Sequence, residues 1–139
     1  MGLELDLLGT LTVLIDGQTR LPDGRGGTRV IGVSSQCRWE GPRIQASSTL
    51  APATDWVAVA PDGTGSVDAR MTLRTDDGAI ILLRYTGRIS YRGESGASVV
   101  VAPTFETSDE RYAWLNGVQA IAKGERQGTR LVYEIYAVR

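Results

Sequence analysis

The sequence contains no histidine, one cysteine and one lysine among its 139 residues. Without histidine the chain cannot form a Ser-His-Asp triad, a Cys-His pair or an imidazole-ligated zinc site. The single Cys37 excludes an intrachain disulfide and a multi-cysteine metal site. Lys123 alone could support Schiff-base chemistry. Proton transfer would therefore fall to Asp, Glu, Tyr, Lys or water, and we expect neither a metal nor a cofactor.

Long apolar runs and blocks of like charge are also absent. No stretch is long enough to cross a bilayer, and the N-terminus lacks a charged region followed by an apolar core. The net charge is −1, so the chain has no general attraction for nucleic acid or anionic membranes. We therefore expect a cytoplasmic protein that binds neither, and one domain over residues 1–139.

The chain does have seventeen glycines, dispersed among short segments rich in β-branched and aromatic residues. Such segments are typical of an all-β protein. Residues 18–27 are predicted to be a long loop, and residues 124–128 the turn of the closing hairpin. Residues 109–116 are predicted to form a short helix, with Thr107 as its cap. We predict a single antiparallel β-barrel of about eight to ten strands, because closure removes exposed edges.

The most informative segment, residues 67–87, is predicted to be a β-hairpin with one polar strand face. Asp68 and Arg70 alternate with the apolar residues Val67 and Ala69, so the two sets point to opposite faces. The polar face either meets solvent or lines a cavity inside the barrel. In a cavity, Arg70 could anchor an anionic group and Asp68 could serve as a base. The alternative is an ion pair that fixes strand register.

Six short segments, taken in order, resemble the family called domain of unknown function 3237. These segments are Asp55-Trp56, Pro61-Asp-Gly63, Val67-Asp-Ala-Arg70, Thr75-Asp-Asp-Gly78, Pro103-Thr-Phe-Glu-Thr107 and Tyr112-Ala-Trp-Leu-Asn116. The resemblance covers the last two-thirds of the chain well and the first third more loosely. It implies a β-barrel with a short helix near the C-terminus, often assembled into oligomers. Where family members tend to be glycine-rich, residues 34–40 carry Arg38 and Trp39, which could reshape one end of a cavity.

The remaining candidate site residues are polar or aromatic side chains near predicted strand ends and on the helix. Tyr112 and Asn116 are four apart on one helix face and could donate hydrogen bonds to an oxyanion, or could simply dock and cap the helix. For the substrate-binding residues, contact with a ligand and packing in the core remain alternatives. These residues are Trp39, Asp55, Trp56 and Tyr85.

Taken together, these features predict a small-molecule-binding barrel that acts as a cofactor-free enzyme. The expected reaction is proton-transfer chemistry on a carbonyl or carboxylate compound, namely isomerisation, addition–elimination or cyclisation, as in a lyase, isomerase or cyclase. Asp68, Arg70, Tyr112 and Asn116 are the predicted catalytic residues. We expect a small organic substrate and a homo-oligomer. The alternatives are a non-catalytic ligand-binding protein and a purely structural oligomeric barrel.

Overall fold

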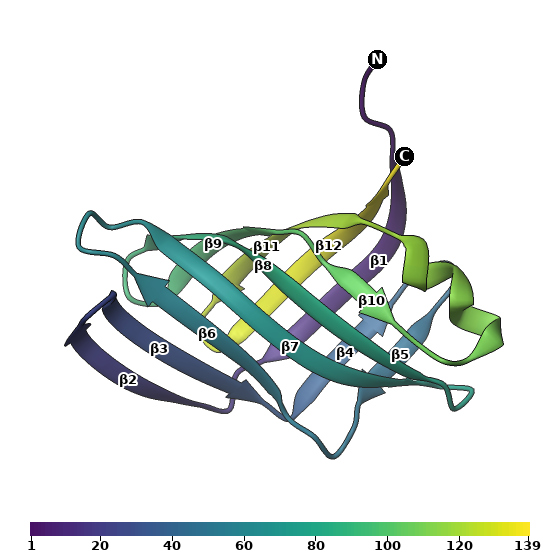
Figure 1. Cartoon of the computed structure of the whole chain (residues 1–139). Helices are drawn as coiled ribbons and strands as arrows, with labels where there is room; N and C mark the ends of the chain where they lie inside the picture. The colour runs from purple at the N-terminus through teal and green to yellow at the C-terminus, as the bar shows by residue number, and fades with distance from the viewer.

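A computed structural model describes residues 1–139 as one antiparallel sheet curled into a barrel (Figure 1). The predicted all-β barrel is thus confirmed, with twelve strands and one 3₁₀ helix, η1, at Glu110–Gly117. The strands are β1 (Leu5–Leu14), β2 (Gly17–Gly24), β3 (Gly27–Ser34), β4 (Gln36–Glu40), β5 (Gln45–Ser48), β6 (Ala53–Val59), β7 (Gly65–Thr75), β8 (Ile80–Arg92), β9 (Gly96–Val101), β10 (Thr104–Glu106), β11 (Ala120–Gln127) and β12 (Arg130–Val138).

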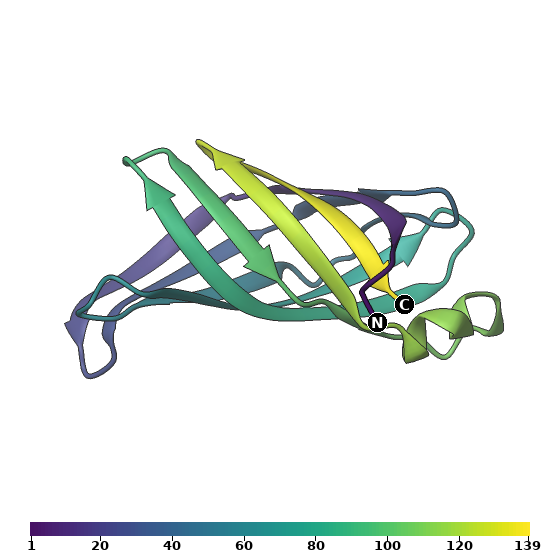
Figure 2. The ribbon, with the colours of Figure 1, turned by 90° about the horizontal axis from the view of Figure 1, so that it is seen from above.

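Pairing of β7 with β8 closes the sheet into a ring. Going round from β8, the ring passes through β9, β11, β12, β1, β4 and β5 to β7. Strand β7 is long enough to pair with β5 along its C-terminal part and with β6 along its N-terminal part. Strands β6, β3 and β2 therefore continue the sheet beyond the ring and extend one end of the barrel (Figures 1 and 2).

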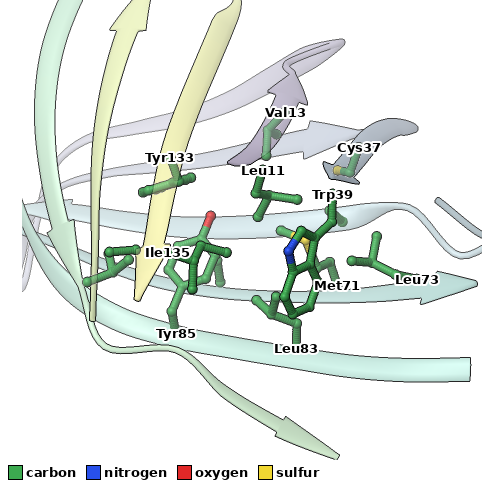
Figure 3. Packing of buried hydrophobic residues seen from close by; sticks show 14 of the residues in the cluster. Leu11, Val13, Cys37, Trp39, Met71, Leu73, Leu83, Tyr85, Tyr133 and Ile135 are labelled. Atoms are coloured by element: carbon green, nitrogen blue, oxygen red, sulfur yellow. The ribbon is translucent and has the colours of Figure 1, made fainter. Parts of the chain in front are cut away.

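Alternation of side chains along the strands fills the interior. In β7 the apolar set that begins with Val67 and Ala69 is buried, whereas the intervening polar residues are exposed or half-buried. A single cluster of 29 buried residues results, and Figure 3 shows how side chains from several strands meet within it. No helix in the structure is long enough to cross a bilayer.

The predicted loop over residues 18–27 is wrong, since this segment forms most of β2 and the turn that leads into β3. Pro22 is tolerated there because β2 is the edge of the sheet and needs no amide donor on its open side. The β2–β3 register shifts between Leu21 and Gly24, and Asp23 between them has a positive φ of 52°. A bulge thus turns the chain where a longer loop was expected.

The helix occurs where it was predicted, but its cap differs. Asp109, in extended conformation, accepts a hydrogen bond from the amide of Arg111, so Asp109 is the N-cap in place of Thr107. Two residues before this cap, the Thr107 hydroxyl accepts a hydrogen bond from the amide of Asp109. The chain enters the helix through two successive side-chain caps, which two neighbouring polar residues make possible.

Candidate functional site

A pocket of about 580 Å³ opens into the end of the barrel that β2, β3 and β6 extend. This volume lies in the range of small-molecule sites. Its wall is mainly apolar, with a few polar side chains. The residues that matter for its chemistry are Gly32, Asp55, Tyr85, Tyr91, Arg20 and Arg126.

Asp55 on β6 is the acidic group in the pocket wall. Its Oδ1 atom is buried and has no hydrogen-bond partner. Burial raises the pKa of this carboxyl to about 6, an effect that a hydrogen bond from the backbone amide of Asp68 partly offsets. A carboxyl with a pKa near neutral can both accept and return a proton at physiological pH.

Gly32 leaves the Asp55 carboxyl open to the pocket. The β3–β6 register places Gly32 directly opposite Asp55, and directly opposed residues in a ladder present their side chains on the same face. A side chain at this position would enter the pocket on the same face of the sheet as Asp55. The nearest atom to a Cβ built at Gly32 is Cγ2 of Ile15, 4.0 Å away, so the space is empty. Glycine here leaves the space opposite Asp55 unfilled.

Two tyrosines lie beneath the pocket. The rings of Tyr85 on β8 and Tyr133 on β12 meet edge to face with centroids 5.3 Å apart, and Figure 3 shows them close together in the interior. Burial raises the pKa of both phenols, and the Asp55 charge raises the pKa of each further. Both therefore remain protonated donors at neutral pH. Tyr85 lines the pocket, while the Tyr133 hydroxyl is buried without a partner.

Gly124 makes room for the Tyr133 ring. These two residues are opposite each other in the β11–β12 register, and a Cβ at Gly124 would lie 2.6 Å from two ring carbons of Tyr133. Such a distance is far below van der Waals contact. The absence of a side chain at Gly124 thus fixes where the tyrosine pair lies.

The rim of the pocket is basic and aromatic. Arg126 near the end of β11 has its guanidinium 5.8 Å from the ring centroid of Tyr91, and both residues line the pocket. Arg20 on the edge strand β2 lines the same opening. The pocket therefore combines a carboxyl in its wall with guanidinium groups at its entrance.

Of the two placements that the sequence left open for the Asp68–Arg70 face, the structure shows the one that meets solvent. Both side chains are exposed, on the outer face of β7, whose inner face is apolar. Asp68 forms a loose ion pair with Arg84 on β8, 3.8 Å away, so the two predicted partners do not pair with each other. The face meets solvent because the inner positions of β7 are needed for the apolar core. Neither Asp68 nor Arg70 lines the pocket that contains Asp55, although Arg70 borders a separate hollow on the outer face.

Trp39 and Trp56 also lie away from the pocket. Trp39 is fully buried, stacks on Phe105 with centroids 5.3 Å apart, and donates its indole N–H to the Leu8 carbonyl over 2.9 Å. It is a core residue that closes part of the barrel. Trp56 follows Asp55 on β6 and so points outward, with half of its surface exposed. Of the predicted binding residues, Asp55 and Tyr85 line the pocket.

Tyr112 and Asn116 dock the helix and do not line the pocket. The Tyr112 hydroxyl donates to the carboxylate of Asp77 over 2.9 Å, and Asp77 also accepts from the hydroxyl of Thr75. Asn116 accepts from the Thr107 amide and donates to the Thr107 carbonyl. Burial and the contact with Asp77 raise the pKa of Tyr112. The Tyr112 bond ties η1 to the β7–β8 turn, and the Asn116 bonds tie the end of η1 to the segment that precedes it.

Tyr112→Phe is expected to lower the melting temperature while leaving ligand binding in the pocket unchanged. Loss of the hydroxyl removes the bond to Asp77, and loss of one such bond corresponds to roughly 3–6 °C in a domain of this size. Thermal unfolding followed by circular dichroism measures the change. Asn116→Ala should give a loss of similar size, since both residues hold the same helix. An unchanged melting temperature for both variants would contradict this docking role.

The pKa of Asp55 predicts how stability changes with pH. A carboxyl whose folded-state pKa is raised binds its proton more tightly in the folded chain, so folding stability falls as pH rises from about 4 to about 6. The full loss above that window is at most about 3 kcal/mol. Asp55→Asn removes this loss. We expect the variant to gain stability relative to the parent between pH 4 and pH 7, in roughly that amount.

Urea unfolding of the two proteins at each pH measures the difference. The carboxyls with lowered pKa values, such as Asp76 beside Arg38 and Asp109 beside Arg111, change stability in the opposite direction. They are present in both proteins, so their contributions cancel in the comparison. A difference that does not vary with pH would show that Asp55 titrates normally.

The fold and the pocket define a class, namely closed antiparallel barrels with a pocket at one end. The family model described as "Protein of unknown function (DUF3237)" matches residues 3–138. The chain belongs to this family, as the sequence resemblance indicated.

Known relatives include an enzyme. A segment of 59 residues, 42% of this chain, is 42% identical to the hydroalkoxylation enzyme phnH from Penicillium herquei and covers 34% of it. The matched segment thus spans about a third of that relative's length. The crystal structure of an enzyme from Penicillium herquei aligns with a TM-score of 0.74 at 20% identity, covering 100% of this chain and 96% of that one.

Bacterial structures share the fold more closely. A beta-barrel like protein from Acinetobacter baumannii has a TM-score of 0.89 at 25% identity over 100% of this chain and 98% of that one. A conserved protein of unknown function from Rhodopseudomonas palustris has a TM-score of 0.90 at 21% identity, over 100% and 99% of the two chains.

Proposed function

We propose that the pocket is the active site of a cofactor-free enzyme that adds a hydroxyl group to a carbon–carbon double bond of the same molecule, closing a ring. The double bond would be conjugated to a carbonyl. The observation that carries the proposal is Asp55, whose buried Oδ1 has no partner and whose carboxyl has a pKa of about 6 in a largely apolar pocket. Near neutral pH it is available as a base and, once protonated, as an acid.

In the proposed reaction, Asp55 moves the proton and Tyr85 stabilises the enolate, since both residues line the pocket. The Asp55 carboxylate accepts the proton of the substrate hydroxyl, and the oxygen attacks the double-bond carbon remote from the carbonyl. A carbon–oxygen bond forms, the π bond breaks, and its electron pair moves onto the carbonyl oxygen as an enolate. The Tyr85 hydroxyl, in the pocket wall, donates a hydrogen bond to that oxygen. Asp55 then returns the proton to the adjacent carbon, so product and substrate are isomers.

The name of the Penicillium herquei relative supports this choice among proton-transfer reactions. Hydroalkoxylation is the addition of an O–H bond across a double bond, and phnH is named for it. It needs one group that can take up and return a proton, which is what the Asp55 site offers. Isomerisation would place a similar demand on Asp55, so the relative's name is the reason to prefer addition, and the ring closure is part of the proposal.

Cyclisation of ortho-hydroxychalcone to the flavanone tests the proposal. Ring closure removes the conjugation of the chalcone, so absorbance reports the rate, and chiral chromatography separates the enantiomers. We expect a rate above the buffer reaction and an excess of one enantiomer, because the spontaneous reaction gives a racemate. As a control, ortho-allylphenol, whose double bond is not conjugated to a carbonyl, should react far more slowly. Binding of the chalcone with racemic product at the background rate would favour a non-catalytic binding protein.

Assembly into a homo-oligomer remains a prediction. Light scattering after size-exclusion chromatography measures it directly, and a mass of 15.0 kDa would correspond to the monomer.

A further inference from the structure

Arg126 lies in the inner wall of the barrel although arginine is ordinarily a surface residue. Along β11 the inward positions alternate through Ala120, Ala122 and Gly124 to Arg126, and Arg126 is half-buried in the pocket wall. The guanidinium therefore faces the space that a ligand would occupy. Its stem crosses the apolar part of the wall, as long cationic side chains commonly do.

The guanidinium is held in place, yet its charge is not neutralised. Arg126 donates to the carbonyls of Gly128 over 3.0 Å and Glu94 over 3.5 Å, and it lies over the Tyr91 ring. It forms no ion pair. In contrast, five other arginines pair with carboxylates: Arg38, Arg84, Arg92, Arg111 and Arg139. A fixed cation without an anion can bind one supplied by a ligand.

The charges of the pocket orient such a ligand. The Asp55 carboxylate would repel a second carboxylate placed next to it, whereas Arg126 and Arg20 at the rim attract one. Glu94 and Arg20 at the rim are both exposed, so water screens their opposite charges, whereas Arg126 is half-buried. A ligand with a carboxylate at one end would thus enter with its other end toward Asp55.

We propose that Arg126 binds the carboxylate of an aromatic substrate, with Tyr91 beside it and Arg20 adding positive charge at the rim. This inference rests on the proposed function and names its substrate class, an aromatic carboxylic acid whose reacting hydroxyl and double bond lie at the far end, near Asp55. The apolar wall contacts the rings, and the fork of the guanidinium matches the two carboxylate oxygens.

Two probes of equal shape, naphthalene carboxylate and naphthalene carboxamide, separate charge from fit. Isothermal titration calorimetry at neutral pH should show the carboxylate binding at least about tenfold tighter to the parent protein. In Arg126→Gln the two probes should bind with about equal affinity. Continued binding of the carboxamide would show that the pocket is intact. The matched control is Arg88→Gln on the exposed outer face of β8, which should keep the preference.

Arg20→Gln should reduce the preference less than Arg126→Gln, because Arg20 lies on the exposed edge strand. Three results would each overturn the proposal. The parent protein could bind the two probes equally, it could bind neither up to millimolar concentration, or the preference for the carboxylate could persist in Arg126→Gln. Since the probes cannot react, these results do not depend on turnover. If the protein prefers the carboxylate probe but does not cyclise the chalcone, the proposed reaction is refuted, whereas the proposed anion site is supported.

Discussion

Asp55→Asn should reduce cyclisation by about 10²–10⁴-fold in kcat, with little effect on binding of the carboxamide probe. The amide has nearly the same shape as the carboxyl but cannot accept the hydroxyl proton or return one to carbon. The pocket therefore still fills, and the proton transfer fails. Single-turnover absorbance with ortho-hydroxychalcone measures the loss. Because the substitution removes a buried carboxylate, the folded protein should be no less stable at neutral pH.

The pH profile gives a second readout of the same group. The base form of Asp55 starts the reaction. Therefore kcat/KM should rise with pH through about 6, which is the pKa of Asp55 in the ligand-free protein, and level off above that pH. A site that merely binds would have no such inflection in rate. The residual rate of Asp55→Asn should rise without an inflection near that pH, following only the ionisation of the substrate hydroxyl.

Asp68→Asn is the control that separates this site from the one suggested by the strand pattern alone. Asp68 is exposed on the outer face of β7, between the inward-facing residues Val67 and Ala69. It should retain nearly full activity. Full activity of Asp55→Asn, or a loss confined to Asp68→Asn, would refute the assignment of Asp55 as the proton-transfer group.

The strand pattern could predict the barrel but not which face of β7 points inward. Alternation in β7 separates polar from apolar residues correctly, and the apolar set is the buried one. The polar set suggested a cavity only under the assumption that the interior is polar there. In fact the middle of the barrel is filled by side chains such as Trp39 and Leu83, and the cavity lies at one end. That division depends on packing between strands distant in sequence.

The end that holds the pocket is built from segments whose sequence resembles loops. Residues 18–27 contain one proline and three glycines, yet they form most of β2 and the turn into β3 beside the pocket. Likewise Arg126 was expected in the closing turn, whereas β11 continues through Gln127 and so directs Arg126 inward. Pairing with β9 and β12 on both sides extends the strand, and neither partner is visible from local sequence.

Asp55 could be predicted from the sequence because a carboxyl near the start of a strand is conspicuous. The role of Gly32 could not be predicted. Its importance comes from the residue opposite it across the β3–β6 ladder, and register is a property of the assembled sheet. Tyr133 was identifiable as one of the alternating apolar set of the last strand. That its hydroxyl lies buried without a partner depends on the fold.

Gly32→Ile should abolish access to Asp55 without destabilising the barrel, and we expect a loss of about 100-fold or more in kcat/KM. The space beside Gly32 is empty, and its φ is not in the left-handed region, so a side chain fits without strain. A β-branched residue inside a strand is favoured over glycine, so stability should stay level or rise slightly. The new side chain would occupy the pocket directly opposite the carboxyl.

A graded series makes the argument quantitative. Gly32→Ala adds one methyl group, 4.0 Å from Ile15, and should cost far less activity than Gly32→Ile. Gly117→Ile, at an exposed helix end with open space around it, serves as the matched control and should leave turnover unchanged. Binding of naphthalene carboxamide should decline in the same order as turnover, because both need the same volume. If Gly32→Ile folds, is as stable as the parent and still binds and turns over normally, the reacting end of the substrate does not lie beside Asp55.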